Sequence, residues 1–184
     1  MGFLIFLALV VVVLLWIVGL YNRLVRARNE VRNAWSQIDV QLKRRWDLIP
    51  NLMETVKGYM RHERETLEAV TKARQQAIAV TGDVAARAQA ENILSQTLRS
   101  LFALAENYPE LKANQNFLAL QEELTSTENK IAFARQYYND SVMRLNNLIQ
   151  MFPSNIVAGQ FGFKPETYFE LEAAEERKRP EVKF

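Results

Sequence analysis

Residues 3–20 read FLIFLALVVVVLLWIVGL, eighteen residues without one charged side chain. Fifteen of the eighteen are Leu, Ile, Val or Phe. At a rise of 1.5 Å per residue, a helix of this length spans roughly 27 Å, close to the thickness of about 30 Å of a bilayer's hydrocarbon core. The stretch therefore predicts a transmembrane anchor over residues 1–22. No Pro or Gly follows Gly19 before Pro50, so we expect the anchor helix to continue into a soluble helix.

Aromatic and basic side chains flank the apolar stretch where a helix would meet lipid headgroups. We expect the membrane interface to be formed by Trp16, Tyr21, Arg23, Arg26 and Arg28. Basic flanks stay on the cytoplasmic side, which places the N-terminus outside and the remaining domain in the cytoplasm. A cleaved signal peptide and a buried core helix are the alternatives. No basic residue precedes the stretch, which exceeds a usual signal-peptide core and lacks a small-residue cleavage pattern after it.

Composition limits the remaining chain to one domain of about 160 residues, enough for its own core. The formal net charge is only +2, and residues 23–45 hold seven basic and two acidic side chains. This excess beside the anchor favours anionic headgroups as its target and argues against nucleic acid as a partner. The chain has no cysteine, which excludes disulfides, cysteine nucleophiles and thiolate metal sites.

The spacing of apolar residues after the anchor predicts helices throughout. The apolar residues between Val31 and Ile49 recur at steps of three and four, which is the spacing of one face of a helix. We expect Pro50 to kink this helix or to start a new one near Asp47. Thr81-Gly82-Asp83 predicts a stop with an N-cap, and Tyr108-Pro109 predicts another break.

The last helix has the most regular pattern, with alternating steps of three and four over eleven positions. These are Phe117, Leu120, Leu124, Thr127, Ile131, Ala134, Tyr138, Ser141, Leu145, Leu148 and Phe152. Such a heptad seam predicts coiled-coil-like packing against long neighbouring helices. We therefore predict an all-α fold: a transmembrane helix continuous with an antiparallel four-helix up-and-down bundle over residues 23–153. Residues 154–184 form an extended apolar tail that packs on the bundle or on a neighbouring subunit, its last part solvated.

No constellation of catalytic or metal-binding residues is recognisable. His62-Glu63 resembles the start of a zinc-protease motif, but Thr66 occupies the position of the second histidine. The solvated face of the last helix is expected to carry Glu122, Glu123 and Glu128. The sequence has no glycine-rich loop of the kind that binds phosphate. We expect a protein that is not an enzyme and that needs no cofactor or metal.

Three groups of side chains are candidates for contact with a partner. The first surrounds the expected break in the helix and comprises Arg44, Arg45, Asp47, Pro50 and Asn51. The alternative for this group is a simple turn in which Asp47 caps the next helix and Trp46 packs inside. The second group, Tyr137 and Asn139, lies beside the seam of the last helix. The third, Phe161 and Phe163, belongs to the apolar tail.

Several short strings together make the chain recognisable. They are Tyr21-Asn22, the string from Arg44 to Leu52, Glu68-Ala69-Val70 with Ala73-Arg74, the string from Glu106 to Ala113, Glu128-Asn129, Ala134-Arg135, Tyr138-Asn139 and Phe152-Pro153. With these strings the chain closely resembles the LemA family of bacterial membrane proteins over nearly its whole length. The resemblance implies one N-terminal membrane segment, a cytoplasmic four-helix bundle and no known enzymatic activity. Proteins of this family are often encoded near membrane proteins, including membrane zinc metalloproteases, and the resemblance therefore implies an accessory role.

Two functions are consistent with these features. The first is a membrane-anchored helical scaffold that self-associates at the bacterial inner membrane, because membrane confinement gives all copies one direction and raises their effective concentration. The second is an adaptor or accessory subunit of a membrane protease or envelope stress system.

Overall fold

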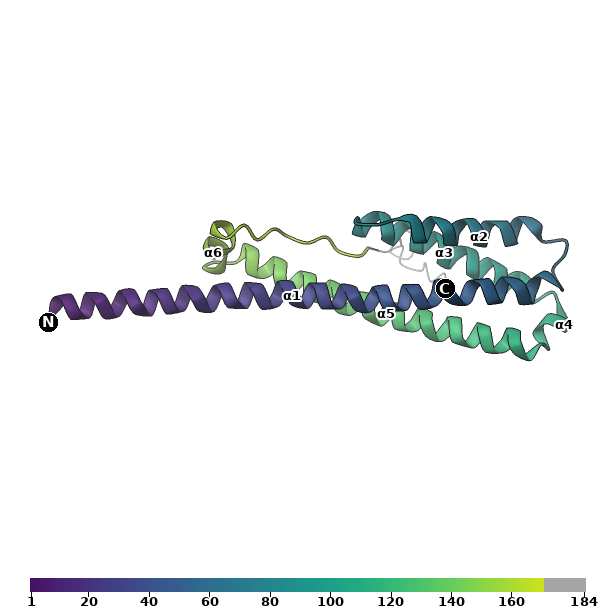
Figure 1. Cartoon of the computed structure of the whole chain (residues 1–184), viewed down its shortest axis with the longest axis horizontal. Coiled ribbons are helices and arrows are strands. Elements are labelled where there is room, and N and C mark those ends of the chain that lie inside the picture. The colour runs from purple at the N-terminus through teal and green to yellow at the C-terminus, as the bar shows by residue number, and fades with distance from the viewer. Residues whose placement is uncertain (171–184) are drawn as a thin grey trace, which may run out of the picture. The chain divides into compact units, whose positions relative to one another are not determined.

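The computed structural model describes residues 1–170, and its regular elements are all helices (Figure 1). They are α1 (Gly2–Lys57), α2 (Arg64–Ala79), α3 (Val84–Ala105), α4 (Pro109–Lys112), α5 (Gln115–Gln150) and α6 (Ser154–Gln160). No strand occurs within the described residues. The all-α class and the long apolar N-terminal helix are thus confirmed.

Two compact units share the two longest helices. Unit 1 combines Met1–Asp39 with Phe133–Tyr168, so it holds the first part of α1, the last part of α5 and α6. Unit 2 contains Val40–Ala132, and the last described residues, Phe169 and Glu170, also belong to it. Each unit has its own core.

Helix α1 passes through Pro50 without ending, so the expectation of a new helix near Asp47 was wrong. A proline within a helix has no N–H for the carbonyl four residues earlier, here that of Trp46. The Nε of Arg74, on α2, donates to this Trp46 carbonyl at 2.8 Å. A side chain from another helix therefore replaces the missing bond, and α1 continues to Lys57.

The other helix boundaries follow local sequence signals. Gly82 has φ +85° and turns the chain between α2 and α3, a conformation that glycine adopts without strain. Asp83 caps α3, because its side chain accepts the N–H of Ala85 at 2.9 Å. Pro109 begins α4, where its missing N–H has no cost. The predicted stop with an N-cap and the predicted break at Tyr108-Pro109 are both confirmed.

Unit 2 is organised around one apolar core to which α1, α2, α3 and α5 all contribute. Its buried members include Ile49 and Leu52 from α1, Val70 and Ala77 from α2, Leu94 and Leu101 from α3, Leu111 from α4, and Phe117 and Leu124 from α5. Removing each of the larger side chains, the Val, Leu, Ile and Phe residues, from water contributes roughly 1.5–3 kcal/mol before the entropy of folding is subtracted. The small alanines of α2 and α3, among them Ala73 and Ala90, fill positions between the larger side chains.

Unit 1 is held by the faces of α1 and α5 that the sequence patterns identify. Val31 and Ile38 of α1 and Ala134 and Leu145 of α5 are buried. The ring of Trp35 meets that of Tyr138 edge-on, with the centroids 5.4 Å apart. Aromatic pairs in this arrangement contribute beyond their buried area.

The heptad seam of α5 is buried over nearly all of its length. Leu120 and Leu148 are half-buried, and Phe152 lies beyond the end of the helix and is 78% exposed. The hydroxyls of Thr127 and Ser141 donate to the carbonyls of Glu123 and Tyr137, both at 2.8 Å. These two polar residues are therefore satisfied within their own helix, as such side chains often are.

The tail packs within unit 1, and its first part is helical instead of extended. Helix α6 forms because Val157 and Ala158 bury one face against Leu24 of α1. After the turn at Gly162, with φ +68°, the backbone of Glu166 bonds the side chain of Asn146 at both its N–H and its carbonyl, at 2.9 and 3.0 Å. The last part of the tail, which was predicted to be solvated, lies outside the described residues from residue 171 onward.

Candidate functional site

The apolar segment of α1 has the length and composition of a membrane span. An 18-residue window near the N-terminus has a mean hydropathy of 3.3, and none of it is buried in the structure. Trp16 is 53% exposed within it. By its length and its lack of charge, this helix could cross a bilayer.

At the end of this segment the structure brings together residues that the sequence left far apart. The ring of Tyr21 contacts that of Phe161, with the centroids 4.8 Å apart, and lies 6.0 Å from that of Phe163. The guanidinium of Arg28 lies 5.0 Å from the centre of the Phe163 ring. Arg23 and Arg26 are exposed. The structure therefore brings Tyr21 and Arg28, two of the residues predicted for the membrane interface, together with the aromatic tail residues Phe161 and Phe163.

The candidate contacts on α5 also lie in unit 1. The hydroxyl of Tyr137 donates to Glu30 on α1 at 3.3 Å, and its side chain is 38% exposed. Arg144 pairs with the same Glu30 carboxylate at 3.2 Å. Asn139 is half-buried and has partners of its own. Tyr137 thus contacts the neighbouring helix α1.

The candidate contacts around Pro50 separate into exposed and buried residues. Asp47, Pro50 and Asn51 are exposed on α1, and the Nε of Arg44 donates to Glu123 at 2.9 Å near the surface. Arg45 is only 1% exposed. Because α1 is continuous here, adjacent residues point in different directions, and Arg45 enters the core of unit 2 instead of reaching a partner.

Arg45 is the centre of a buried ionic cluster. Its Nη1 donates to Glu128 at 2.6 Å and to the hydroxyl of Ser95 at 2.8 Å, and its Nη2 pairs with the carboxylate of Glu91. Ser95 in turn donates to Glu128 at 2.7 Å, and the indole N–H of Trp46 donates to Glu91 at 3.0 Å. Three helices, α1, α3 and α5, therefore meet through charged hydrogen bonds.

Burial governs the electrostatics of this cluster. Removal from water raises the pKa of Glu91, while the charge and hydrogen bond of Arg45 act in the opposite direction. Glu128 is more exposed than Glu91, with 38% of its side chain accessible. A cavity of about 210 Å³ opens next to the cluster, lined in part by Arg99, Phe102 and Asn129. The cluster holds helices in place, and no histidine or metal-ligand set accompanies it in the described part of the chain.

The sequence interpretation missed Glu91 and assigned Glu128 to a solvated face. A signal was nevertheless present, because Glu91 lies three residues from both Ala88 and Leu94 on the buried face of α3. Arg45 likewise lies three residues after Leu42 and four before Ile49, both buried. A single charge on the apolar face of each of two helices indicates that the two charges pair.

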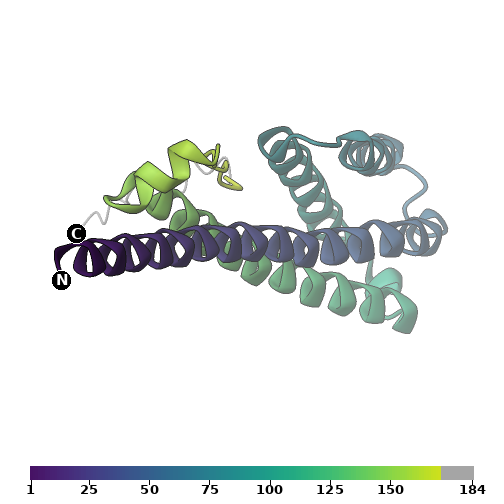
Figure 2. The same ribbon diagram turned by 60° about the vertical axis from the view of Figure 1, so that its left-hand side comes forward.

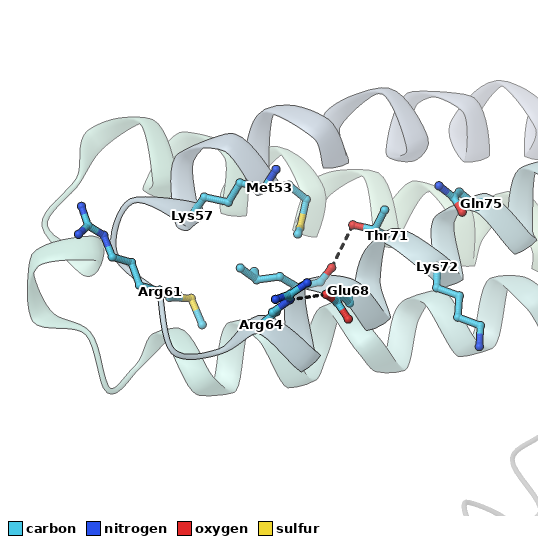
Figure 3. Close-up of a pocket in the computed structure, with 10 residues that line it drawn as sticks. Met53, Lys57, Arg61, Arg64, Glu68, Thr71, Lys72 and Gln75 are labelled. Atoms are coloured by element: carbon cyan, nitrogen blue, oxygen red, sulfur yellow. Dashed lines mark hydrogen bonds and ion pairs between the residues drawn. The ribbon is translucent and has the colours of Figure 1, made fainter.

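An open groove between α1 and α2 is the second notable cavity of unit 2 (Figure 3). Its volume is about 540 Å³. Met53, Met60 and Leu67 provide its apolar surface, and Lys57, Arg61, Arg64 and Lys72 surround it with positive charge. Glu68 is the acidic residue of the lining and pairs with Arg64 at 2.7 Å. The groove suits a ligand that is both anionic and apolar.

The remaining candidate for chemistry, His62, is exposed in the loop before α2. Within the described residues no three His, Cys, Asp or Glu side chains lie close enough together to hold a metal ion.

Comparison with known proteins identifies the relatives of this chain. The family described as the LemA family matches residues 34–184. The protein LemA of Metamycoplasma hominis is 30% identical over 141 residues, which are 77% of this chain and 64% of that protein. The chain therefore matches less than two thirds of this relative's length.

Proposed function

Because the chain belongs to the LemA family, we propose that it is a non-enzymatic, membrane-anchored helical scaffold that self-associates at the bacterial inner membrane. The observation that carries the proposal is the exposed, uncharged segment of α1 between Phe3 and Leu20. Its fifteen large apolar residues favour insertion by about 5 kcal/mol, at roughly 0.3–0.6 kcal/mol each. The soluble part then forms an antiparallel four-helix bundle beneath the membrane.

The basic flank supports a cytoplasmic location for the bundle. Arg23, Arg26, Arg28 and Arg32 all follow the span, and positive side chains beside a span remain on the cytoplasmic side. Protease added to intact spheroplasts should leave the region after Tyr21 uncut, and lysis should expose it. Cleavage from outside would contradict this orientation.

The connection between the span and the folded part supports a scaffold. Helix α1 continues across Asn22 without a break. Leu24, directly beyond the span, is fully buried with Val157, Ala158 and Phe163. The end of the span is therefore joined to α6 and the start of the tail by side-chain packing, so every copy meets the bilayer in the same way.

An exposed aromatic residue supports self-association. Phe133 on α5 is 72% exposed in unit 1 although it lies well beyond the apolar span. Copies confined to one membrane and sharing one direction need only a weak lateral contact to assemble. Contact between such apolar side chains would hide them from water.

The absence of cysteine from the chain makes this contact testable. Phe133→Cys should give a disulfide-linked dimer when native membranes are oxidised. Asn33→Cys, at an exposed polar position of α1 in the same unit, is the control and should give much less. Equal, lipid-dilution-sensitive crosslinking at both positions would reflect random collision and would count against self-association.

A second function, that of an adaptor for a membrane protease or an envelope stress system, is favoured by the groove between α1 and α2. The basic and apolar side chains that line the groove match an acidic segment of a partner protein that also carries apolar side chains. A photoreactive residue replacing Thr71 should then capture a partner in native membranes. Arg61→Glu with Lys72→Glu should abolish the adduct, whereas Lys43→Glu, outside the groove, should not. Capture of other copies of this chain alone would contradict the adaptor function.

A further inference from the structure

A second uncharged stretch lies in the C-terminal part of unit 1. Between Arg144 and Lys164 the chain has nineteen consecutive residues without a charged side chain. They cover the end of α5, the corner at Pro153 and all of α6. Unlike the span, this stretch is divided between two helices and a turn, so it is too irregular to cross a membrane.

The stretch folds beside the end of the membrane span. Val157, Ala158 and Phe163 share a core with Leu24, and Ile17 and Leu20 of the apolar segment pack against the same core. Figure 2 shows α6 lying next to α1 from a direction different from that of Figure 1. Helix α6 is therefore level with the last turns of the span and with the first arginines that follow it.

Four large apolar side chains of this corner are largely exposed. Met151 is 61% exposed, Phe152 78%, Ile156 64% and Phe161 55%. Ser154, Val157, Ala158 and Phe163 of the same segment are buried, and its exposed positions carry no charge. A surface of this kind on a folded unit marks a contact with something apolar.

The position of the surface decides what it contacts. If the span occupies the hydrocarbon core, residues 17–25 lie at its boundary with the headgroups, and the corner lies there too. Elements in this zone bury apolar side chains by about 5–10 Å and place cations next to the headgroups. Lys164 directly follows the stretch, and Arg23 and Arg26 are exposed at the same level of α1.

We propose that the corner between α5 and α6, with Met151, Phe152, Ile156 and Phe161 outermost, inserts into the membrane interface as a second, non-spanning lipid contact. This inference rests on the proposed membrane anchoring. The corner lies beside the end of the span, and its insertion fixes the depth and tilt of unit 1 in the bilayer. A second copy of the chain is the competing occupant of this surface, but the continuity of its core with Ile17 and Leu20 favours lipid.

Environment-sensitive labels on single cysteines test the inference in the full chain. The label is placed at Phe152→Cys for the corner, at Leu9→Cys for the span and at Gln136→Cys, an exposed site about 20 Å along α5, for water. The protein is reconstituted into vesicles of phosphatidylcholine and phosphatidylglycerol. Lipid-attached nitroxide should quench the label at residue 152 several-fold more than iodide does, and the order should reverse at residue 136. Adding Ile156→Asp should move the label at residue 152 toward water without changing the label at residue 9.

Three outcomes would overturn the inference. A label at residue 152 as open to iodide as that at residue 136 would place the corner in water. Protection from both quenchers, with disulfide formation between copies at residue 152, would assign the surface to a second copy. A response of the residue 152 label that is unchanged by Ile156→Asp would exclude the apolar face as its cause. Failure of the membrane anchoring itself is distinguishable, because the label at residue 9 would then escape the lipid quencher as well.

Discussion

The two units bury different kinds of polar group. In unit 1 the buried polar side chains are neutral, and Tyr138, Ser141 and Asn146 each bond a backbone group. In unit 2 the buried polar groups include the charges of Arg45 and Glu91, which bond each other. Tyr138 and Asn146 tie the tail to α5 through neutral hydrogen bonds, whereas the paired charges of Arg45 and Glu91 join α1 to α3. The two units should therefore respond differently to mutation and to pH.

The largest effect is expected from removing the central charge of unit 2. Arg45→Met leaves Glu91 buried without its partner and should lower the free energy of unfolding by about 3–5 kcal/mol. Arg44→Met is the matched control, since its pair with Glu123 is near the surface and is worth about 1 kcal/mol or less. Chemical unfolding of the full chain in detergent, followed by circular dichroism, measures both. Equal effects of the two variants would contradict the structural role of the ionic cluster.

In unit 1 the largest effect should come from an apolar side chain. Leu145 is 1% exposed, and Leu145→Ala should cost about 2–5 kcal/mol through lost burial and the cavity that remains. Met143→Ala, at an exposed position two residues away, should cost far less. The same unfolding measurement applies. A loss at residue 143 as large as that at residue 145 would mean that the packed face of α5 is wrongly assigned.

A smaller effect is expected where a neutral side chain holds the tail. Asn146→Ala removes both hydrogen bonds to the backbone of Glu166. Because Glu166 is exposed, water can replace these bonds, and their loss should lower the free energy of unfolding by about 1–2 kcal/mol in total. Hydrogen exchange of the Glu166 amide should become faster, while Asn147→Ala, at the exposed neighbouring position, leaves it unchanged. Unaltered exchange in Asn146→Ala would show that the tail is held by other contacts.

Glu91 should make unit 2 sensitive to acid-range pH. Burial raises the pKa of Glu91, so on raising pH the unfolded chain loses this proton before the folded chain does. Through this residue, the free energy of unfolding should then fall as pH rises from the ordinary carboxyl value through the raised one. The free energy of unfolding of the parent protein, minus that of the Glu91→Gln variant, should decline as pH rises over this range. The same difference for Glu54→Gln, at an exposed site, should not change with pH. A difference that grows with pH would mean that Arg45 outweighs burial.

Tyr138 should make unit 1 sensitive to alkaline pH. Burial, with a contribution from the negative charge of Glu166, raises the pKa of Tyr138 to about 12. The unfolded chain ionises first, near pH 10, so stability should fall between pH 10 and about 12. Tyr138→Phe cannot ionise, and the alkaline loss should shrink in this variant when unfolding is followed across that range. An identical loss in both proteins would remove Tyr138 as its cause.

Local signals in the sequence predicted much of the fold. The apolar run at residues 3–20, the cap at Asp83 and the break at Pro109 each depend on residues within a few positions of one another. The seam of α5 was equally readable, because its period is a property of one helix. These features required no knowledge of what packs against them.

The features that the sequence did not predict depend on distant partners. Pro50 is tolerated inside α1 because Arg74 bonds the carbonyl that proline leaves free, that of Trp46, which is 28 residues from Arg74 in the chain. Arg45 and Glu91 are 46 residues apart, and either alone would be read as a surface charge. The helical start of the tail likewise depends on its contact with Leu24. Local propensity cannot identify such partners, although a lone charge on an apolar face indicates that one exists.

The account depends most on the chain being embedded in lipid and associated with other copies of itself. The most direct test is the mass of the complex extracted from membranes together with its surrounding lipid, measured for the full chain. We predict several copies of the chain in each lipid particle, at a protein concentration where random co-occupancy is negligible. A single copy per particle, or a mature chain that lacks residues 3–20, would contradict the account.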